Sequence, residues 1–416
     1  MEFEVINPTN QEILGDPTSF EFDLKNLKLI QGLFFDVINQ LAGKPLPEFY
    51  LINKIALSLN ELQLGRFLEK NFLYLHTTHR KTIFDKMTNL MNSKKFTSGL
   101  TGLQGTGKSH FLADFVLRHR LSFDKSKIRI MYINNSVLYF ANPTNYILNE
   151  LIYMVCLDLN IDQFNMEEDS VEIPENIINN SNDIIKWLLF LHKKKSVEKI
   201  KVFVECLKSY YNKIGIKLVI VWDQINVFSQ EDKKNQNMEL ELYKSFSKSY
   251  EFFDCILLSA SNNNKQINSS TDSGWKPLDQ LDPVQVFDHD EFSKLLKFET
   301  YCYHYLPNDI NNNENFEKFA AELSQLTNYS ISEYFSYKKA FRDEEEKTFL
   351  FNSKSWQEIK RIYKERRCSQ INKSEVKFQQ KYLSNNLELL EYYIAMKYLL
   401  TFEEKQNMDE SIKVKN

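Results

Sequence analysis

The stretch of sequence that decides the fold is Gly102-Leu103-Gln104-Gly105-Thr106-Gly107-Lys108-Ser109, which fits the pattern GxxxxGK[ST] without a mismatch. Glycines in this pattern let the backbone wrap tightly, so that successive N–H groups point at bound phosphates. The lysine reaches the β and γ phosphates, and the serine hydroxyl binds Mg²⁺. We therefore expect residues 102–109, with His110 in the following helical turn, to hold a nucleoside triphosphate, ATP or GTP.

The context of this loop supports the same interpretation. A short strand is expected at Phe96–Leu100, and apolar residues at helical spacing follow in Lys108–Leu121. The chain has only 10 glycines, and four of them fall between Gly99 and Gly107. A glycine-poor chain that concentrates glycine here indicates a backbone requirement rather than an ordinary glycine-rich turn.

A phosphate-binding loop of this kind needs a carboxylate on a neighbouring strand to hold Mg²⁺ through water. The wholly apolar run Leu218–Trp222 is typical of a strand buried on both faces, and Asp223 follows at its carboxyl end. We expect Asp223 and Ser109 to be the magnesium ligands. The alternative for Asp223 is a helix-capping role.

Three further residues are candidates for catalysis. Gln224 stands where motor ATPases of the AAA type carry a glutamate base, and a glutamine can orient a water but cannot accept its proton. Ser259 and Asn262 follow the apolar run Cys255–Leu258, where a polar side chain can reach the γ-phosphate. Turn chemistry explains these two residues equally well. Hydrolysis is therefore expected to be slow.

Short apolar strands that alternate with helices predict an α/β fold with a parallel sheet. The pattern predicts a P-loop NTPase core of the AAA/STAND kind at residues 86–290. A helical N-terminal region is expected at residues 1–85, with helices at 24–42 and, with breaks, at 61–94. A helical C-terminal region or lid is expected at residues 291–416. Further strands are expected at Ile128–Ile133 and Val284–Phe287.

The distribution of arginine argues against a ring-forming motor ATPase. No arginine occurs between Arg129 and Arg342. Ring-forming AAA+ motors usually carry a trans-acting arginine shortly after the strand that would correspond to Cys255–Leu258. We therefore expect a switch rather than a hexameric motor, although a lysine could substitute.

Composition sets limits on partners and location. The formal net charge of −4 gives no reason to expect whole-protein attraction to nucleic acid or to an anionic membrane. The acidic N-terminus resembles neither a signal peptide nor a transit peptide, and no window is apolar enough for a membrane helix. The 5 scattered cysteines indicate buried thiols. We expect an intracellular protein, cytoplasmic or nuclear, with a protein partner that the sequence does not identify.

For two other groups of residues, a structural or solvent-exposed role is favoured over a functional one. His76 and His79 are three residues apart and lack a third metal ligand nearby, so a surface or packing role is favoured. The basic residues from Arg361 to Arg367, near Trp356, are more typical of a solvated helix face than of a nucleic-acid contact.

Several segments together resemble the P-loop NTPase domain of Crinkler (Crinkler-RHS type) proteins. They appear in that family's order over residues 75–335: Arg80–Met87, the phosphate loop, Trp222–Phe228, Leu258–Asn263, Val286–Phe292 and Leu326–Asn328. The resemblance implies an NTPase module. The chain departs from the family because it lacks an LFLAK-type header, and its loop has Gln104-Gly105-Thr106 where the family usually has Pro-Gly-Ile.

A thinner resemblance links the loop and the Asp-x-x-Asn pattern at Asp223–Asn226 to the death-associated GTP-binding protein of the mitochondrial small ribosomal subunit. Three functions therefore stand side by side. The first is a slow ATPase that acts as a nucleotide-gated switch. The second is a scaffold that binds the nucleotide without hydrolysing it, and the third is a ribosome-associated GTP binder.

Overall fold

The computed structural model of the chain divides into two compact units, residues 1–302 with 323–334 and residues 303–322 with 335–416. The residues that it describes are 4–6, 23–41, 49–53, 71–75, 77–93, 95–100, 102, 106–121, 127–164, 176–225, 238–259, 279–281, 284, 287–303, 307, 309–310, 312–327, 329, 334, 337 and 354–365. The ranges expected for an N-terminal region and a core, 1–85 and 86–290, both fall in the first unit, and the boundary between them stays a prediction.

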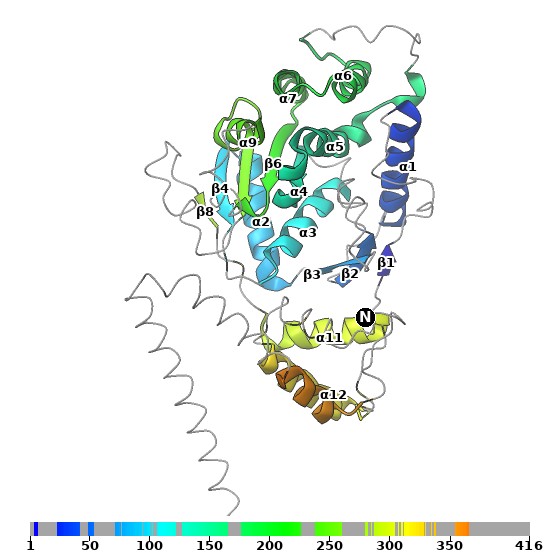
Figure 1. The fold of residues 1–416 in the computed structure, drawn as a ribbon, viewed down its shortest axis with the longest axis vertical. Coiled ribbons are helices and arrows are strands. Elements are labelled where there is room, and N and C mark those ends of the chain that lie inside the picture. The colour runs from blue at the N-terminus through cyan, green and yellow to red at the C-terminus, as the bar shows by residue number, and fades with distance from the viewer. Residues whose placement is uncertain are drawn as a thin grey trace, which may run out of the picture. The chain divides into compact units, whose positions relative to one another are not determined.

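The first unit is built on a five-stranded sheet in which every described pairing is parallel (Figure 1). The order across the sheet is β5-β6-β7-β4-β8. The strands are β4 (Phe96–Leu100), β5 (Ile128–Ile133), β6 (Lys217–Trp222), β7 (Cys255–Ser259) and β8 (Asp279–Gln280). The chain runs from β4 to the far edge at β5, returns through β6 and β7, and then passes β4 to reach β8. The order therefore reverses at β4, which is where ligands bind in open α/β sheets.

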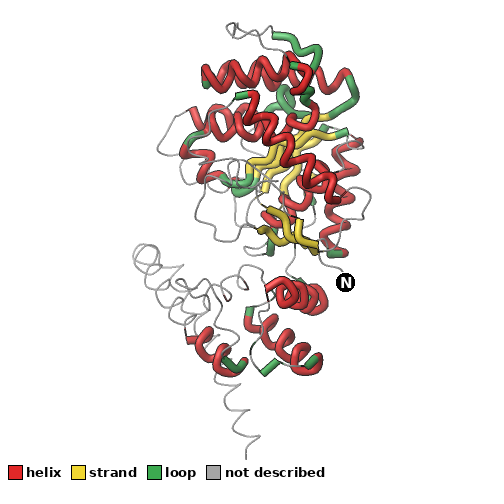
Figure 2. Tube along the Cα trace, turned by 90° about the vertical axis from the view of Figure 1, so that its right-hand side faces the viewer, coloured by secondary structure: helices red, strands yellow, loops and turns green. Residues whose placement is uncertain are grey.

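Helices cover both faces of this sheet (Figure 2). Helices α2 and α3 pack on one face, and α1, α5, α6, α7 and α9 contribute to the core on the other. The helices of the first unit are α1 (Leu24–Leu41), α2 (Thr78–Ser93), α3 (Lys108–Leu121), α4 (Ser136–Ala141), α5 (Pro143–Val155), α6 (Ser181–Lys194), α7 (Val197–Lys213), α9 (Met238–Lys248) and α11 (His289–Tyr303).

The alternation of side chains along the strands explains why two cores form. In β6, Val219 and Val221 belong to the core with α2 and α3, while Leu218, Ile220 and Trp222 belong to the opposite core. Because successive residues of a strand point to opposite faces, an unbroken apolar run can bury both. The predicted α/β fold with a buried parallel sheet is confirmed.

Helix α3 has the predicted bounds but a different environment. Every residue from Phe111 to Arg120 is buried, so the helix lies inside the unit rather than exposing a polar face. Its charges are accommodated by local partners: Arg118 Nε donates to Asp114 Oδ1 at 2.7 Å. His119 stacks on Phe84 of α2, with ring centroids 5.5 Å apart.

The N-terminal region contains strands as well as the predicted helix. α1 matches the expected range 24–42 closely, but a three-stranded sheet forms from β1 (Glu4–Ile6), β2 (Phe49–Asn53) and β3 (Asn71–Leu75). The helical interpretation of residues 61–94 is therefore wrong at β3 and right at α2. The aromatic residues Phe72 and Tyr74 favour a strand, and this strand pairs with β2.

The strand expected at Val284–Phe287 is wrong at both ends of that range; residues 285 and 286 lie outside the described residues. Val284 and Phe287 are buried but lie in no strand, and β8 forms a few residues earlier. The Val284 side chain belongs to the core with α2 and α3 while its backbone lies against Gly102, and the Phe287 ring packs against Arg80. These apolar side chains are thus buried without joining the sheet.

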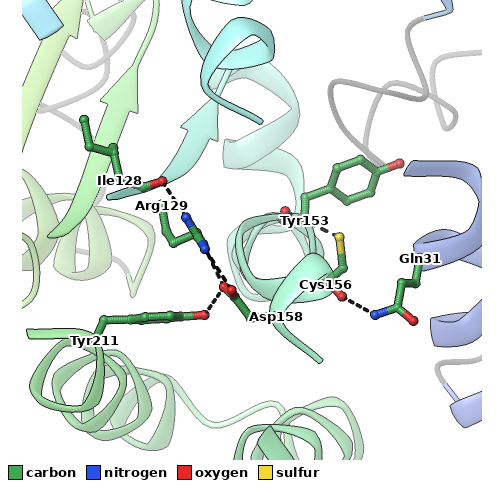
Figure 3. A network of polar contacts seen from close by, with 7 residues as sticks. All are labelled: Gln31, Ile128, Arg129, Tyr153, Cys156, Asp158 and Tyr211. Atoms are coloured by element: carbon green, nitrogen blue, oxygen red, sulfur yellow. Dashed lines mark hydrogen bonds and ion pairs between the residues drawn. The ribbon is translucent and has the colours of Figure 1, made fainter. Parts of the chain in front are cut away.

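A buried polar network lies at the amino end of β5 (Figure 3). Arg129 donates to both carboxylate oxygens of Asp158, at 2.8 and 2.9 Å, and the Tyr211 hydroxyl bonds to the same carboxylate. Gln31 of α1 donates to the carbonyl of Cys156 at 2.6 Å. The network joins α1, β5, α7 and the turn after α5, at the end of the sheet opposite to the phosphate loop.

The second unit has its own small aromatic cluster. Trp356 packs edge-on against Phe319, and its indole N–H donates to Glu322 at 2.8 Å. Glu322 also accepts from Lys360, at 2.7 Å. Arg361 pairs with Glu365 one helical turn away, which accords with the predicted solvated face; Arg366 and Arg367 lie outside the described residues. None of the helices described here is long and apolar enough to cross a membrane.

Candidate functional site

The predicted phosphate loop lies between β4 and α3. Gly102 and Gly107 have φ angles of 150° and 85°, in the region that favours glycine, and α3 begins at Lys108. The described part of the loop thus has the glycine-dependent backbone that the motif predicts. Leu103, Gln104 and Gly105 lie outside the described residues.

Gly102 is also required for space. A Cβ atom built on Gly102 would lie 2.6 Å from the carbonyl oxygen of Val284 and 3.1 Å from the Thr106 hydroxyl. The first of these contacts is with backbone, which cannot turn aside as a flexible side chain can. The segment after β8 therefore packs directly on the first glycine of the loop.

Lys108 lies over the loop. Its Nζ donates to the carbonyl of Gly102 at 2.8 Å, and the side chain is half-buried. Burial lowers the pKa of Lys108, and the nearby Asp223 carboxylate raises it in part. The ammonium group is thus held between the loop and the end of β6.

Asp223 follows β6 and is buried, with 2% of its surface exposed. Its Oδ1 accepts the backbone N–H of Gln224 at 2.8 Å. Ser136, at the start of α4, donates its hydroxyl to the Asp223 carbonyl at 2.8 Å. Gln224 itself has a φ of 58°, an uncommon left-handed conformation for a residue other than glycine. The chain is therefore held in a sharp turn directly after the carboxylate.

The other carboxylate oxygen of Asp223 is the most informative atom of the site. Among the described residues, Asp223 Oδ2 and Ser259 Oγ are buried and have no partner at hydrogen-bonding geometry. Burial raises the pKa of Asp223, while the nearby hydroxyls of Ser109 and Ser259 lower it. A buried carboxylate oxygen without a partner is costly, and a cation or an ordered water would satisfy it.

These oxygens are the ligands that Mg²⁺ takes in proteins. Magnesium binds one or two protein oxygens and keeps several waters, with substrate phosphates supplying the rest. Asp223, Ser109 and Ser259 fit that description, since their oxygens gather at one edge of the sheet. Among the described residues no group of three or more His, Cys, Asp or Glu could hold a metal by itself.

The register of the sheet brings the predicted residues together. Ser259 pairs with Leu100, the last residue of β4 before the loop, and Leu258 pairs with Trp222, next to Asp223. A neighbouring strand was expected to carry the carboxylate. Instead, β7 lies between β4 and β6, the strand that Asp223 follows. Ser259 occupies the position between the loop and the carboxylate.

Some predicted residues are not placed, and some contributors were not predicted. Asn262 and Asn226 lie outside the described residues, as does His76. Neither Arg80, which donates to the loop carbonyl of Thr106, nor Ser136, which holds Asp223, was singled out as a site residue. Ser136 closes the polar triplet Asn134-Asn135-Ser136 at the carboxyl end of β5, a signal that sequence reasoning could have used.

The fold and the site together define the class: a parallel α/β sheet with a phosphate loop at the strand where the sheet order reverses is the fold of a P-loop NTPase. No known protein-family model matches the chain, and no curated protein matches it.

The solved structures that the chain matches have little sequence identity to it. A Walker-type ATPase of Pyrococcus abyssi is 13% identical, with 76% of this chain and 83% of that one covered and a TM-score of 0.45. The ORC2 protein of Aeropyrum pernix, in ADPNP–ADP complexes, is 10% identical, with 54% and 51% covered and a TM-score of 0.32. Drosophila ORC bound to DNA is 12% identical, with 64% and 55% covered and a TM-score of 0.31. The chain thus spans about half of each of the two ORC structures.

Proposed function

We propose that this protein binds a nucleoside triphosphate with Mg²⁺ at the loop of residues 102–109 and hydrolyses it slowly. The observation that carries the proposal is the buried Asp223 Oδ2, which has no hydrogen-bond partner among the described residues and lies near the hydroxyls of Ser109 and Ser259. A folded protein tolerates such an atom where a ligand completes its contacts.

The roles of the residues follow from this arrangement. Lys108 would exchange the Gly102 carbonyl for the β and γ phosphates, since a lysine at this position of the motif contacts both. Ser109 and Asp223 would hold the magnesium ion, whose charge neutralises the phosphates. Ser259 lies beside Asp223 and would bind a water of the ion or the γ-phosphate. Asn262 is proposed for the same task from its sequence position alone.

Slow turnover follows from Gln224. An amide cannot accept a proton from the attacking water, although it can orient that water, as in small GTPases. We therefore propose a nucleotide-gated switch rather than a motor. A scaffold that binds without hydrolysis is the second candidate, favoured by the same residue.

Binding is the first experiment. The wild-type protein is titrated with Mg-ATP and Mg-GTP, and the nucleotide that co-purifies is identified. We expect binding that is lost in Lys108→Ala and weakened by EDTA. No binding at millimolar nucleotide would overturn the proposal, and co-purified GTP would favour the ribosomal GTP-binding alternative.

Single-turnover hydrolysis separates the switch from the scaffold. Enzyme in excess over labelled Mg-ATP is followed for hours, with Lys108→Ala as the control. A rate equal to that of the control rules out the enzyme and leaves the scaffold. The switch is tested by hydrogen exchange of residues 303–322 and 335–416 with and without Mg-ATP; unchanged exchange in both ranges contradicts a gated response there.

The proposal also covers the type of NTPase, its location and its protein partner. The resemblance to Crinkler-type NTPases rests on the ordered segments around Asp223, Ser259 and Phe287, and it would make the chain an NTPase module of that type. An intracellular location and an unidentified protein partner stay predictions. Affinity capture with the Mg-ATP-bound protein, compared with Lys108→Ala, tests whether a partner recognises the bound state.

A further inference from the structure

Arg80 lies in the first turn of α2, before β4 in the sequence, whereas the phosphate loop follows β4. Its side chain is buried, with 3% of the residue exposed. One guanidinium nitrogen donates to the carbonyl oxygen of Thr106 at 2.8 Å. Thr106 is a loop residue immediately before Gly107, and only 1% of its surface is exposed. The Arg80 cation thus contacts a backbone carbonyl of the loop.

This contact matters because of how such loops bind phosphate. The backbone N–H groups must point inward at the ligand, so the carbonyl groups between them must point away. An outward carbonyl that is buried needs its own donor, or it costs free energy. Arg80 supplies that donor to Thr106, and a charged donor makes a stronger hydrogen bond than a neutral one.

A face of the guanidinium is covered by an aromatic ring. The Arg80 guanidinium carbon lies 4.4 Å from the centroid of the Phe287 ring. Phe287 is itself held, because its N–H donates to the Tyr329 carbonyl at 3.3 Å. Stacking on an aromatic face is a contact that a planar arginine makes and a lysine does not reproduce.

The start of α11 fixes Phe287 further. Asp288 Oδ1 accepts the N–H of Glu291 at 2.8 Å, and Glu291 Oε2 accepts the N–H of Asp288 at 3.2 Å, which is a reciprocal capping box. Burial lowers the pKa of Arg80 to about 10, and the charges of Glu291 and Asp114 offset part of that effect. The guanidinium therefore stays charged at neutral pH inside a rigid frame.

We infer that Arg80 is a positioning residue for triphosphate binding, which holds the phosphate loop in its binding conformation through the Thr106 carbonyl while Phe287 fixes the guanidinium. The inference rests on the proposed function. Arg80 acts on the loop backbone and not on the base, so its removal weakens every ligand that uses the loop by the same factor.

The test compares Arg80→Met and Arg80→Lys with wild type. Dissociation constants are measured for labelled Mg-ATP and, by competition, for inorganic tripolyphosphate with Mg²⁺, a ligand without a base. We expect Arg80→Met to weaken both ligands about a hundredfold, and Arg80→Lys to weaken both about tenfold, because lysine restores one charged donor without the stacked plane.

Arg129 provides the matched control. Like Arg80 it is a buried arginine, but its partner is the Asp158 carboxylate, and it lies in the network at the amino end of β5 (Figure 3). Arg129→Lys is expected to lower the urea midpoint of the ligand-free protein and to leave both dissociation constants unchanged. Urea unfolding of each Arg80 variant shows whether it is folded under the binding conditions.

Three outcomes overturn the inference. In the first, folded Arg80→Lys and Arg80→Met bind both ligands as wild type does, which makes Arg80 merely structural. In the second, only Mg-ATP weakens, which makes Arg80 a reader of the base. In the third, tripolyphosphate fails to compete in the wild type. If the wild type binds no Mg-ATP, the proposed function fails instead, and loss of binding in Lys108→Ala keeps the two failures distinguishable.

Discussion

Replacement of Gly102 by alanine tests the geometry of the loop most directly. The φ of 150° at Gly102 is a conformation that alanine rarely adopts, at a cost of about 1–3 kcal/mol. The added Cβ would lie 2.6 Å from the Val284 carbonyl oxygen, an overlap that costs roughly 1–3 kcal/mol more. The loop must therefore leave its present conformation, and the summed cost is about 2–6 kcal/mol.

The assay measures the dissociation constant of Mg-ATP and the urea midpoint of the ligand-free protein. Even the lower bound of about 2 kcal/mol, if it falls on the loop, weakens binding about 30-fold. Gly215→Ala is the matched control: Gly215 has a φ of 76° but nothing within 4 Å of the added atom. That variant is expected to lose about 1 kcal/mol of stability and to keep its affinity.

Gly32→Ala completes the series. Gly32 lies exposed in α1, where a Cβ meets nothing within 4 Å, so alanine is expected to stabilise the protein by up to about 1 kcal/mol. The reasoning is refuted if Gly102→Ala matches the wild type in both affinity and midpoint, or if Gly215→Ala loses affinity as Gly102→Ala does.

Two predictions concern titration. Burial raises the pKa of Asp223 above its ordinary value, and only the carboxylate can hold Mg²⁺. Affinity for Mg-ATP is therefore expected to fall as the pH drops through that raised pKa. In Asp223→Asn the Mg²⁺ dependence of binding is expected to disappear, and a variant whose affinity still follows pH as in the wild type contradicts this assignment. Burial lowers the pKa of His119 to about 4, so the unfolded chain takes up a proton that the native protein refuses, and stability present above about pH 6.5 is lost towards pH 4, by up to about 3 kcal/mol. In urea unfolding, His119→Gln should remove that part of the stability lost at acidic pH. The contribution of His192 remains, because burial lowers its pKa to about 3. An equal loss of stability at acidic pH in mutant and wild type would contradict the assignment to His119.

The elements that the sequence predicted best are those with strong local signals. The ranges Lys108–Leu121 and Ile128–Ile133 agree with α3 and β5 at both ends. A glycine before the helix, and a strand segment in which isoleucine recurs at every second or third residue, leave little choice to the chain. β3 was missed because its apolar residues also fit a helical period, and only pairing with β2 decides between the two.

The site was predictable where residues carry their own chemistry. The candidate residues Lys108, Ser109 and Asp223 follow from motif and spacing, because the proposed phosphate and Mg²⁺ ligands would require those groups. Arg80 could not be found in this way, since its partner is a backbone carbonyl 26 residues further along the chain. The position of β7 between β4 and β6 was equally hidden, because strand order depends on packing across the whole sheet.

The insertion of β7 between the loop strand and the Asp223 strand has a consequence for folding. Phe96 pairs with Cys255, so the two strands that frame the loop are about 160 residues apart in the chain, and such distant pairings form slowly. The proposed magnesium ligands meet only when β4, β7 and β6 are all in register. A nucleotide would therefore recognise the chain only after its last central strand has docked, and refolding followed by nucleotide capture would report completion of the sheet.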